Sequence, residues 1–216
     1  DPNGNQKQVK CLVREGSAGN SDWSLSSCMD GFDNDNDGKI DCEDIDFLST
    51  GEGENTIVAL LNSLEKNTEL NSVNGIIFRD SGKIINTKPR SYVENLDSLD
   101  FPLKNAPKAL KDFDKYPKEA FGYIFASRGC PYACTFCESK SMWTRKVRYR
   151  SPENIVAELK QMYEFGIKKV NFDDDTFGVS KKNIKAINDL MHDKLSNMTY
   201  TCETVVQLAK DENVVK

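Results

Sequence analysis

The sequence predicts an α/β protein whose main part is a partial parallel (βα) barrel, incomplete within this chain and preceded by a small, irregular, acidic N-terminal segment. Between residues 121 and 206, short apolar runs alternate with longer segments whose apolar residues recur at helical spacing. Such alternation favours parallel strands joined by right-handed crossovers through helices. Residues 1–48 are instead rich in Gly, Asn, Ser and Asp and have few periodic apolar positions, which favours irregular structure.

The middle of the chain, residues 49–118, is expected to contain a helix, a hairpin and a linker. Residues 55–65 have the apolar spacing of a helix, with Asn55 or Thr56 as the expected N-cap. Residues 75–87 predict two short strands joined by a turn at residues 80–82. From residue 88 onward, prolines predict an extended linker without a long element. These prolines are Pro89, Pro102, Pro107 and Pro117.

The last part of the chain, residues 119–216, is expected to supply the barrel strands. The predicted order is a strand at 121–126, a helix from Ser151 to Gly166, a strand at 167–172, a helix that Ser180 caps, and a strand at 199–206. Parallel strands present their carboxyl ends at one edge of the sheet, where ligands bind in such folds. The loops after the first and second strands are therefore expected to share a site.

A cysteine-rich loop follows the first predicted strand. Cys130, Cys134 and Cys137 have the spacing C-x3-C-x2-C, and the total of seven cysteines argues against complete disulfide pairing. Three thiolates leave one iron of a cubane iron–sulfur cluster without a protein ligand, so that a small molecule can bind there. Zinc with a fourth ligand elsewhere, or disulfides, are the alternatives, although the single histidine, His192, is distant in sequence.

The surrounding sequence resembles the radical SAM enzymes. The resemblance rests on SRGCPYACTFCES and on KVRYRSPENIVAELKQMYEFGIKKVNFDDDTF, and it points to the branch that usually has an N-terminal cobalamin-binding domain. STGEGENTIVALL is similar to the end of that domain, and ENLDSLDFP to the linker after it. The similarity covers residues 44–216. It implies that residues 49–118 are a remnant of the N-terminal domain and 119–216 the N-terminal part of the radical SAM core.

The resemblance implies a [4Fe–4S] cluster and S-adenosylmethionine (SAM) as cofactors. The enzyme would cleave SAM reductively to start radical chemistry on a substrate that the sequence does not identify, with an electron donor such as flavodoxin or ferredoxin. The three loop cysteines would ligate the cluster, and Phe136 would pack near the adenine of SAM. Asp173, Asp174 and Asp175 would bind the methionine amino group, and Glu203 would also contact SAM. Ordinary packing of Phe136 and a solvated aspartate loop are the alternatives.

The sequence departs from this family in two respects. It has no D-x-H-x-x-G motif, and His192 lies in the wrong region, which argues against cobalamin binding by this chain. The family's partial barrel has six βα units, whereas three strands and two helices are predicted here. We therefore expect later SAM contacts to lie beyond residue 216, and the isolated chain to assemble a cluster poorly.

An acidic segment at residues 33–44 matches a twelve-residue calcium loop, with an aspartate in place of the usual glutamate at its last position. The candidate ligands are Asp33, Asp35, Asp37, the Lys39 carbonyl, Asp41 and Asp44. Cys28 and Cys42 bracket this loop and could pair in an oxidising compartment. The alternative function is thus a secreted calcium-binding structural protein with disulfides, or a zinc-binding module. A disordered acidic segment is the simplest alternative for the loop itself.

Charge and hydropathy restrict the partners. The net charge of −5 gives no reason to expect nucleic-acid binding. No apolar run approaches the roughly 20 residues that a membrane-spanning helix needs. No targeting signal precedes the predicted elements. The sequence therefore predicts a cytoplasmic protein, with secretion left open by the calcium-like loop.

Overall fold

The fold is known from a computed structural model that describes residues 11–13, 46–137, 139–192, 195 and 197–209. The chain divides into two compact units, residues 1–92 and residues 93–216. The candidate calcium loop at residues 33–44, with its flanking Cys28, lies outside the described residues. The three-part division expected from the sequence stays a prediction.

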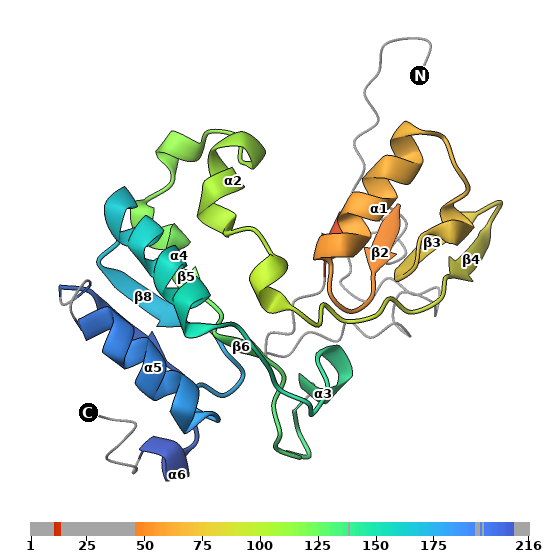
Figure 1. Ribbon diagram of the computed structural model, residues 1–216. Coiled ribbons are helices and arrows are strands. Elements are labelled where there is room, and N and C mark those ends of the chain that lie inside the picture. Colours follow the sequence, from red (N-terminus) through yellow and green to blue (C-terminus); the bar gives the residue numbers. More distant parts are fainter. Residues whose placement is uncertain (1–10, 14–45, 138, 193–194, 196, 210–216) are drawn as a thin grey trace, which may run out of the picture. The chain divides into compact units, whose positions relative to one another are not determined.

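The first unit contains a four-stranded sheet with the order β1-β2-β3-β4. Its strands are β1 (Cys11–Val13), β2 (Phe47–Ser49), β3 (Ile76–Asp80) and β4 (Lys83–Asn86). The first pair is parallel, and the other two pairs are antiparallel. Helix α1 (Glu54–Glu65) connects β2 to the hairpin formed by β3 and β4 (Figure 1).

The predicted hairpin and helix of this unit are confirmed. Ser81 and Gly82 have φ angles of 47° and 78°, which suit the tight primed turns of two-residue hairpins. The predicted N-cap is wrong, because α1 begins after Gly53 without a side-chain cap. Thr56 is instead buried, and its hydroxyl donates a hydrogen bond to the Glu52 carbonyl at 3.2 Å.

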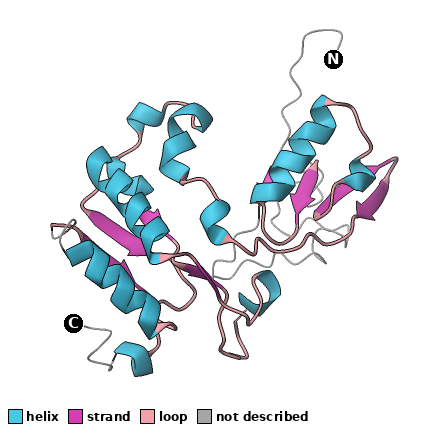
Figure 2. Ribbon diagram, in the orientation of Figure 1, coloured by secondary structure: helices cyan, strands magenta, loops and turns pink. Residues whose placement is uncertain are grey.

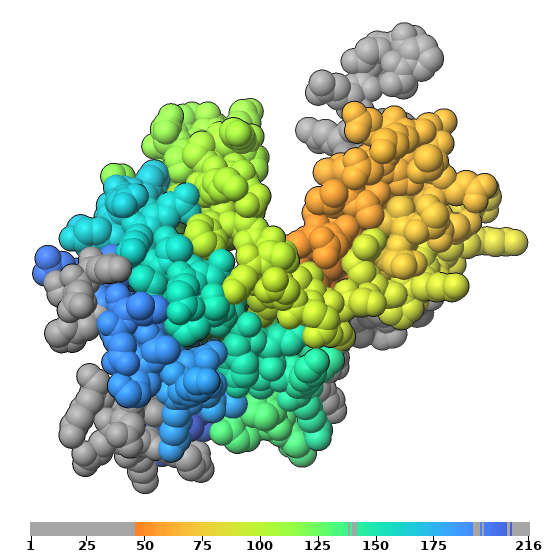
Figure 3. All heavy atoms as spheres, in the orientation of Figure 1, coloured from red at the N-terminus to blue at the C-terminus, as the bar shows by residue number. Residues whose placement is uncertain are grey.

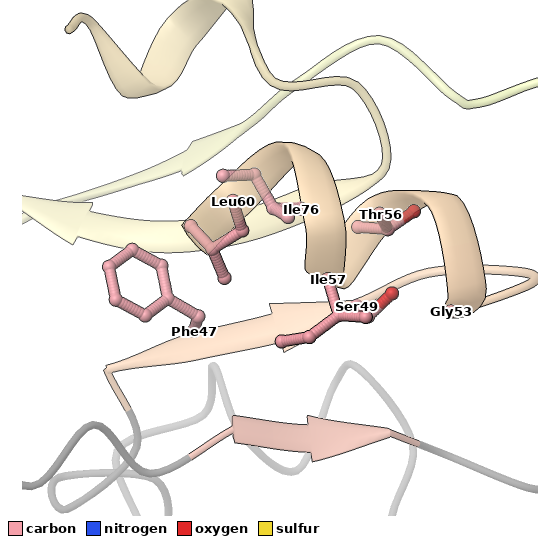
Figure 4. A pocket seen from close by; sticks show the side chains of 7 residues that line it. All are labelled: Phe47, Ser49, Gly53, Thr56, Ile57, Leu60 and Ile76. Atoms are coloured by element: carbon pink, nitrogen blue, oxygen red, sulfur yellow. The ribbon is translucent and has the colours of Figure 1, made fainter. Parts of the chain in front are cut away.

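The core of the first unit lies between α1 and the sheet. It consists of Phe47, Leu60, Val73, Ile76 and Phe78. Figure 4 shows a small, mostly apolar hollow in the same place, between α1 and β2. The Ser49 hydroxyl there is buried and has no hydrogen-bond partner among the described residues. The residues that line the hollow carry no charge, and their only polar side-chain groups are the Ser49 and Thr56 hydroxyls.

The second unit contains the predicted parallel sheet. Strands β5 (Tyr123–Ile124), β8 (Lys169–Phe172) and β9 (Thr199–Cys202) are parallel and adjacent in this order. Helices α4 (Pro152–Phe165) and α5 (Lys181–His192) form the two crossovers and lie side by side on one face of the sheet (Figure 1). The third strand ends at Cys202, short of its predicted end at residue 206, and a short helix, α6 (Val206–Ala209), follows.

The predicted helix boundaries in this unit are confirmed. The Ser151 hydroxyl accepts a hydrogen bond from the Asn154 amide at 3.2 Å, and Pro152 occupies the first turn. Gly166 ends α4 in the left-handed conformation, with φ of 105°. The Ser180 hydroxyl likewise accepts from the Asn183 amide at the start of α5.

One continuous core fills the space between these helices and the strands. Its most buried members come from α4, from β8 and from the turn that precedes β8. They include Ile155, Leu159, Ile167, Val170 and Phe172, which are at most 1% exposed. This packing fixes the sheet and therefore the position of the loops at its carboxyl edge.

The prediction of an extended linker from residue 88 onward is wrong in one respect, because this segment contains a helix. Helix α2 (Pro102–Ala109) has Pro102 at its start and Pro107 inside, with Leu103 and Ala106 buried. A proline in the first turn has no intrahelical hydrogen bond to lose, and burial of Leu103 adds packing energy. Short 3-10 turns at Leu96–Ser98, Phe113–Lys115 and Lys118–Phe121 complete the segment.

A two-stranded antiparallel ribbon, which the sequence analysis did not predict, follows β5. It pairs β6 (Ser127–Arg128) with β7 (Arg148–Tyr149), so that residues 129–147 form a loop whose ends meet (Figure 2). The strand expected at 121–126 is correspondingly shorter, because Phe121 belongs to a 3-10 turn.

Candidate functional site

The cysteine loop, residues 129–147, lies at the carboxyl edge of the parallel sheet. It begins after β5 and β6. The loop that contains Asp173, Asp174 and Asp175, called here the aspartate loop, begins directly after β8, as predicted. Helix α3 (Ser139–Met142) is part of the cysteine loop, which lies at the surface of the unit (Figure 3).

The base of the cysteine loop is closely packed. Gly129 has a φ of 104°, and a Cβ atom there would lie 2.7 Å from the Lys146 carbonyl oxygen. Only glycine fits such an approach without a shift of the backbone. The Arg128 guanidinium lies over the Trp143 ring, 5.1 Å from its centroid. The chain is therefore held tightly just before its first loop cysteine.

The described cysteines of the second unit are free thiols. Cys130 and Cys137 are half-buried, whereas Cys134 and the β9 residue Cys202 are exposed. The Cys137 amide donates to the Cys134 carbonyl at 3.3 Å, which turns the chain between these two residues. The loop thus presents three thiols, none of which is in a disulfide.

The three consecutive aspartates have different surroundings. Asp174 is 4% exposed, and its carboxylate accepts from the Ala126 amide at 2.9 Å and from the Ser127 hydroxyl. Burial raises the pKa of Asp174, and these hydrogen bonds oppose that shift. Asp174 therefore joins the end of β8 to the chain between β5 and β6.

The other two aspartates are exposed and face different partners. The Asp173 carboxylate accepts from the Asn171 side-chain amide at 3.2 Å. The Asp175 carboxylate accepts from the Ser139 hydroxyl, two residues after Cys137, at 2.7 Å. Asp175 thereby connects the aspartate loop to the far end of the cysteine run.

Two further sequence-predicted residues lie at the surface. Phe136, between Cys134 and Cys137, is 90% exposed. Because almost no protein surface covers this ring, ordinary packing does not explain its position. Glu203 is also exposed, and its backbone carbonyl accepts from the Phe177 amide at 2.9 Å. Both side chains are open to a ligand.

Thr176 and Ser139 were not predicted from the sequence as site residues. Thr176 is 5% exposed, and its hydroxyl lies 3.4 Å from the Cys130 sulfur. Its place directly after the aspartates was visible in the sequence, but its contact with Cys130 depends on the parallel pairing of β5 with β8. Ser139 carries no sequence signal of its own.

The three loop thiols are suitable ligands for an iron–sulfur cluster. Within the part of the chain that the structure describes, no three His, Cys, Asp or Glu side chains converge where one metal ion could sit. A cubane cluster binds each thiolate to a different iron, so its ligands surround the cluster and do not meet at one point. Three free thiols from one open loop fit such a group.

The segment that contains both loops matches a known protein family. A model of the radical SAM superfamily matches residues 124–214, which include the cysteine loop, the aspartate loop, β8, β9 and the last residue of β5. This part of the chain is similar to the radical SAM superfamily. Members of this superfamily use a [4Fe–4S] cluster and SAM, which agrees with the donor set of the loop.

Curated proteins match about two thirds of the chain. An uncharacterized methyltransferase of Pyrococcus horikoshii is 37% identical over 145 residues, which are 66% of this chain and 31% of that protein. The anaerobic magnesium-protoporphyrin IX monomethyl ester cyclase of Synechocystis is 33% identical over 138 residues, 63% of this chain and 27% of that protein. The chain therefore spans about a third or less of the length of these relatives.

Solved radical SAM structures have the same fold. The cobalamin-dependent SAM radical enzyme OxsB, with aqua-cobalamin and SAM bound, aligns with a TM-score of 0.56 at 22% identity, over 71% of this chain and 22% of OxsB. The methyltransferase TsrM from Kitasatospora setae aligns with a TM-score of 0.52 at 18% identity, over 71% of this chain and 31% of TsrM. At these identities the likeness concerns the fold alone.

Proposed function

We propose that residues 119–216 form the N-terminal part of a radical SAM core, a partial (βα) barrel in which Cys130, Cys134 and Cys137 ligate a [4Fe–4S] cluster. The supporting observation is the set of three free thiols on one loop at the carboxyl edge of a parallel sheet, inside the segment that the family model matches. When bound, the reduced cluster supplies the electron for cleavage of SAM, which starts radical chemistry on a substrate.

In this proposal the neighbouring side chains position SAM. Phe136 offers an uncovered aromatic face for the adenine, and Asp173 and Glu203 offer exposed carboxylates for the amino group. Asp174 is already occupied by two donors, so its role is to hold the loop and not to bind the ligand. Asp175 shares its carboxylate between Ser139 and solvent.

The proposal covers the first step of the reaction and the class of electron donor, but not the product. The relatives are named as methyltransferases and as a cyclase, so we propose the shared initiating chemistry and no particular product. An electron donor such as flavodoxin or ferredoxin and a reducing, cytoplasmic setting suit free cluster-binding thiols. Among the described residues, no helix is long and apolar enough to cross a membrane.

Anaerobic reconstitution of the 216-residue chain with iron and sulfide tests the proposal. The isolated chain should assemble the cluster poorly, but the fraction that forms should give visible absorbance and, after reduction, an electron paramagnetic resonance signal that changes when SAM is added. Cys134→Ser should lower the bound iron about tenfold or more, because a lost ligand weakens metal binding at least as much as a lost supporting contact.

Cys202→Ser is the matched control, because this thiol is exposed but lies on β9 and outside the cysteine loop. It should bind iron as the unchanged chain does. Equal iron loss in both variants would contradict the assignment of the loop as the cluster site. A cluster whose signal ignores SAM would contradict SAM binding.

A further inference from the structure

A buried hydroxyl group contacts the first cysteine of the loop. Thr176 follows the three aspartates, and its Oγ1 atom lies 3.4 Å from the Cys130 sulfur and 2.7 Å from the Asp175 carbonyl oxygen. The Thr176 side chain is 5% exposed, so water competes little for this hydroxyl. Cys134, by contrast, is exposed to solvent.

The hydroxyl has one proton and two acceptors within reach. A cysteine that ligates iron does so as a thiolate, which has no proton to donate. In the Cys130–Thr176 pair, the threonine hydroxyl is then the only possible donor. Rotation about the Cβ–Oγ1 bond can turn its hydrogen from the Asp175 carbonyl to the sulfur while the oxygen stays in place, since both acceptors are already in range.

We infer that Thr176 is a positioning residue whose hydroxyl donates a hydrogen bond to the Cys130 thiolate and raises the reduction potential of the cluster. This inference rests on the proposed function. Reduction adds negative charge to the cluster, and a donor aimed at a ligand sulfur stabilises the more negative state. Hydrogen bonds around metal ligands are a recognised means of tuning the site they support.

The neighbouring contact supports this arrangement. The Ser139 hydroxyl donates to the Asp175 carboxylate at 2.7 Å, so adjacent residues of the aspartate loop hold the cysteine loop on both sides of its three thiols. Because Thr176 lies between Asp175 and the buried Phe177, its backbone has little freedom to withdraw from Cys130. The contact is therefore built into the fold of the two loops.

Thr176→Val tests the inference, because valine keeps the shape of the side chain and removes the hydroxyl. We expect the one-electron reduction equilibrium of the reconstituted cluster to become about tenfold less favourable, a fall of about 59 mV in its midpoint potential. Thr176→Ser keeps the hydroxyl and should stay near the potential of the unchanged chain. Circular dichroism verifies that each variant is folded.

An independent readout detects the hydrogen bond itself. In the reduced cluster, electron–nuclear double resonance should show an exchangeable proton coupling that disappears in D2O and in Thr176→Val, and that persists in Thr176→Ser. Asp175→Ala is a second control, since it removes the Ser139 contact and keeps the threonine. It should retain this proton coupling.

The possible results separate this inference from the proposed function. If the unchanged chain binds no cluster, the proposed function fails and the inference fails with it. If the cluster forms and Thr176→Val leaves both its potential and its proton coupling unchanged, only the inference is overturned. If the cluster forms in Thr176→Ser but not in Thr176→Val, the result supports a hydrogen bond from the hydroxyl to Cys130. Loss of the cluster in both variants contradicts a role for the hydroxyl.

Discussion

The carboxyl group of Asp174, just after β8, is almost completely buried. Burial raises its pKa, and the charge of Asp175 adds to the rise, whereas the Ser127 hydroxyl and two backbone amides lower it. Because the folded-state pKa lies above the unfolded value, the native state binds this proton more tightly than the unfolded chain does. The stability that Asp174 contributes is full below the unfolded pKa and is lost as the pH rises through the folded pKa.

Asp174→Asn should therefore change how stability depends on pH, since asparagine has no charge to lose. Relative to this variant, the unchanged chain should lose free energy of unfolding as the pH rises from about 4, the unfolded pKa of aspartate. Urea unfolding at several pH values between 4 and 8 measures the trend. The control Asp173→Asn changes an exposed neighbour and should show the same pH dependence of stability as the unchanged chain. If the unchanged chain instead gains stability relative to Asp174→Asn as the pH rises, the expectation is contradicted.

Single residues also mark the limit of what the sequence could predict about the site. The cysteine spacing alone identified the three thiols, because their chemistry depends on local separation along the chain. It could not distinguish Asp174 from Asp173, since only the pairing of β5 with β8 determines which carboxylate turns inward. The contact of Thr176 with Cys130 was hidden for the same reason.

At the scale of elements, a buried ion pair fixes α4 against the strands. The Arg150 guanidinium lies 2.6 Å from the Glu158 carboxylate, with side-chain exposures of 11% and 3%. Arg150 also donates to the Phe125 carbonyl and to the Asn154 side chain, each at 2.8 Å. The guanidinium thus joins the β7–α4 junction to the chain just before β6.

Glu158→Gln should lower the free energy of unfolding by about 3 kcal/mol, because it leaves a buried arginine without its counter-charge. The matched control is Asp189→Asn on α5, which breaks an exposed pair with Lys185, separated by 3.1 Å. That change should cost about 1 kcal/mol or less. Chemical unfolding followed by circular dichroism compares the two, and equal losses would contradict a special role for the buried pair.

The elements that sequence reasoning recovered are those with strong local signals. Ser151, Pro152 and Gly166 mark α4 by their own backbone chemistry, and the structure places its ends there. Helix α2 was not predicted because the four prolines from Pro89 to Pro117 indicate a linker without a long element, whereas burial of Leu103 and Ala106 supports a short helix. Two-residue strands such as β6 and β7 have no periodicity to detect.

At the scale of the whole molecule, each of the two cores draws its residues from one unit. The core of the first unit contains residues between Phe47 and Phe78, and that of the second contains residues between Leu103 and Met198. Residues 93–118 belong with the second core, because Leu103 is buried in it and Phe113 packs against it. The Arg148 guanidinium also donates to the Val93 carbonyl at 2.7 Å.

Two shortened polypeptides test where the second unit begins. Residues 93–216 should fold alone, with a cooperative thermal transition close to that of this unit in the full chain. Residues 119–216, which start at the boundary predicted from sequence, should be less stable by at least about 2–5 kcal/mol, the usual cost of removing a large buried side chain such as Leu103. Equal stability of the two polypeptides would favour the boundary at residue 119.

The ribbon of β6 and β7 lowers the entropy cost of changing the length of the cysteine loop. Its two strands already bring the ends of residues 129–147 together, and doubling the length of a closed loop costs only about 0.6 kcal/mol. Insertions beyond the thiols, between α3 and Lys146, can therefore accumulate during evolution with little loss of stability. Insertions at this place should therefore change the surroundings of the thiols at little cost in stability, while Gly129 and the ribbon hold the start of the loop.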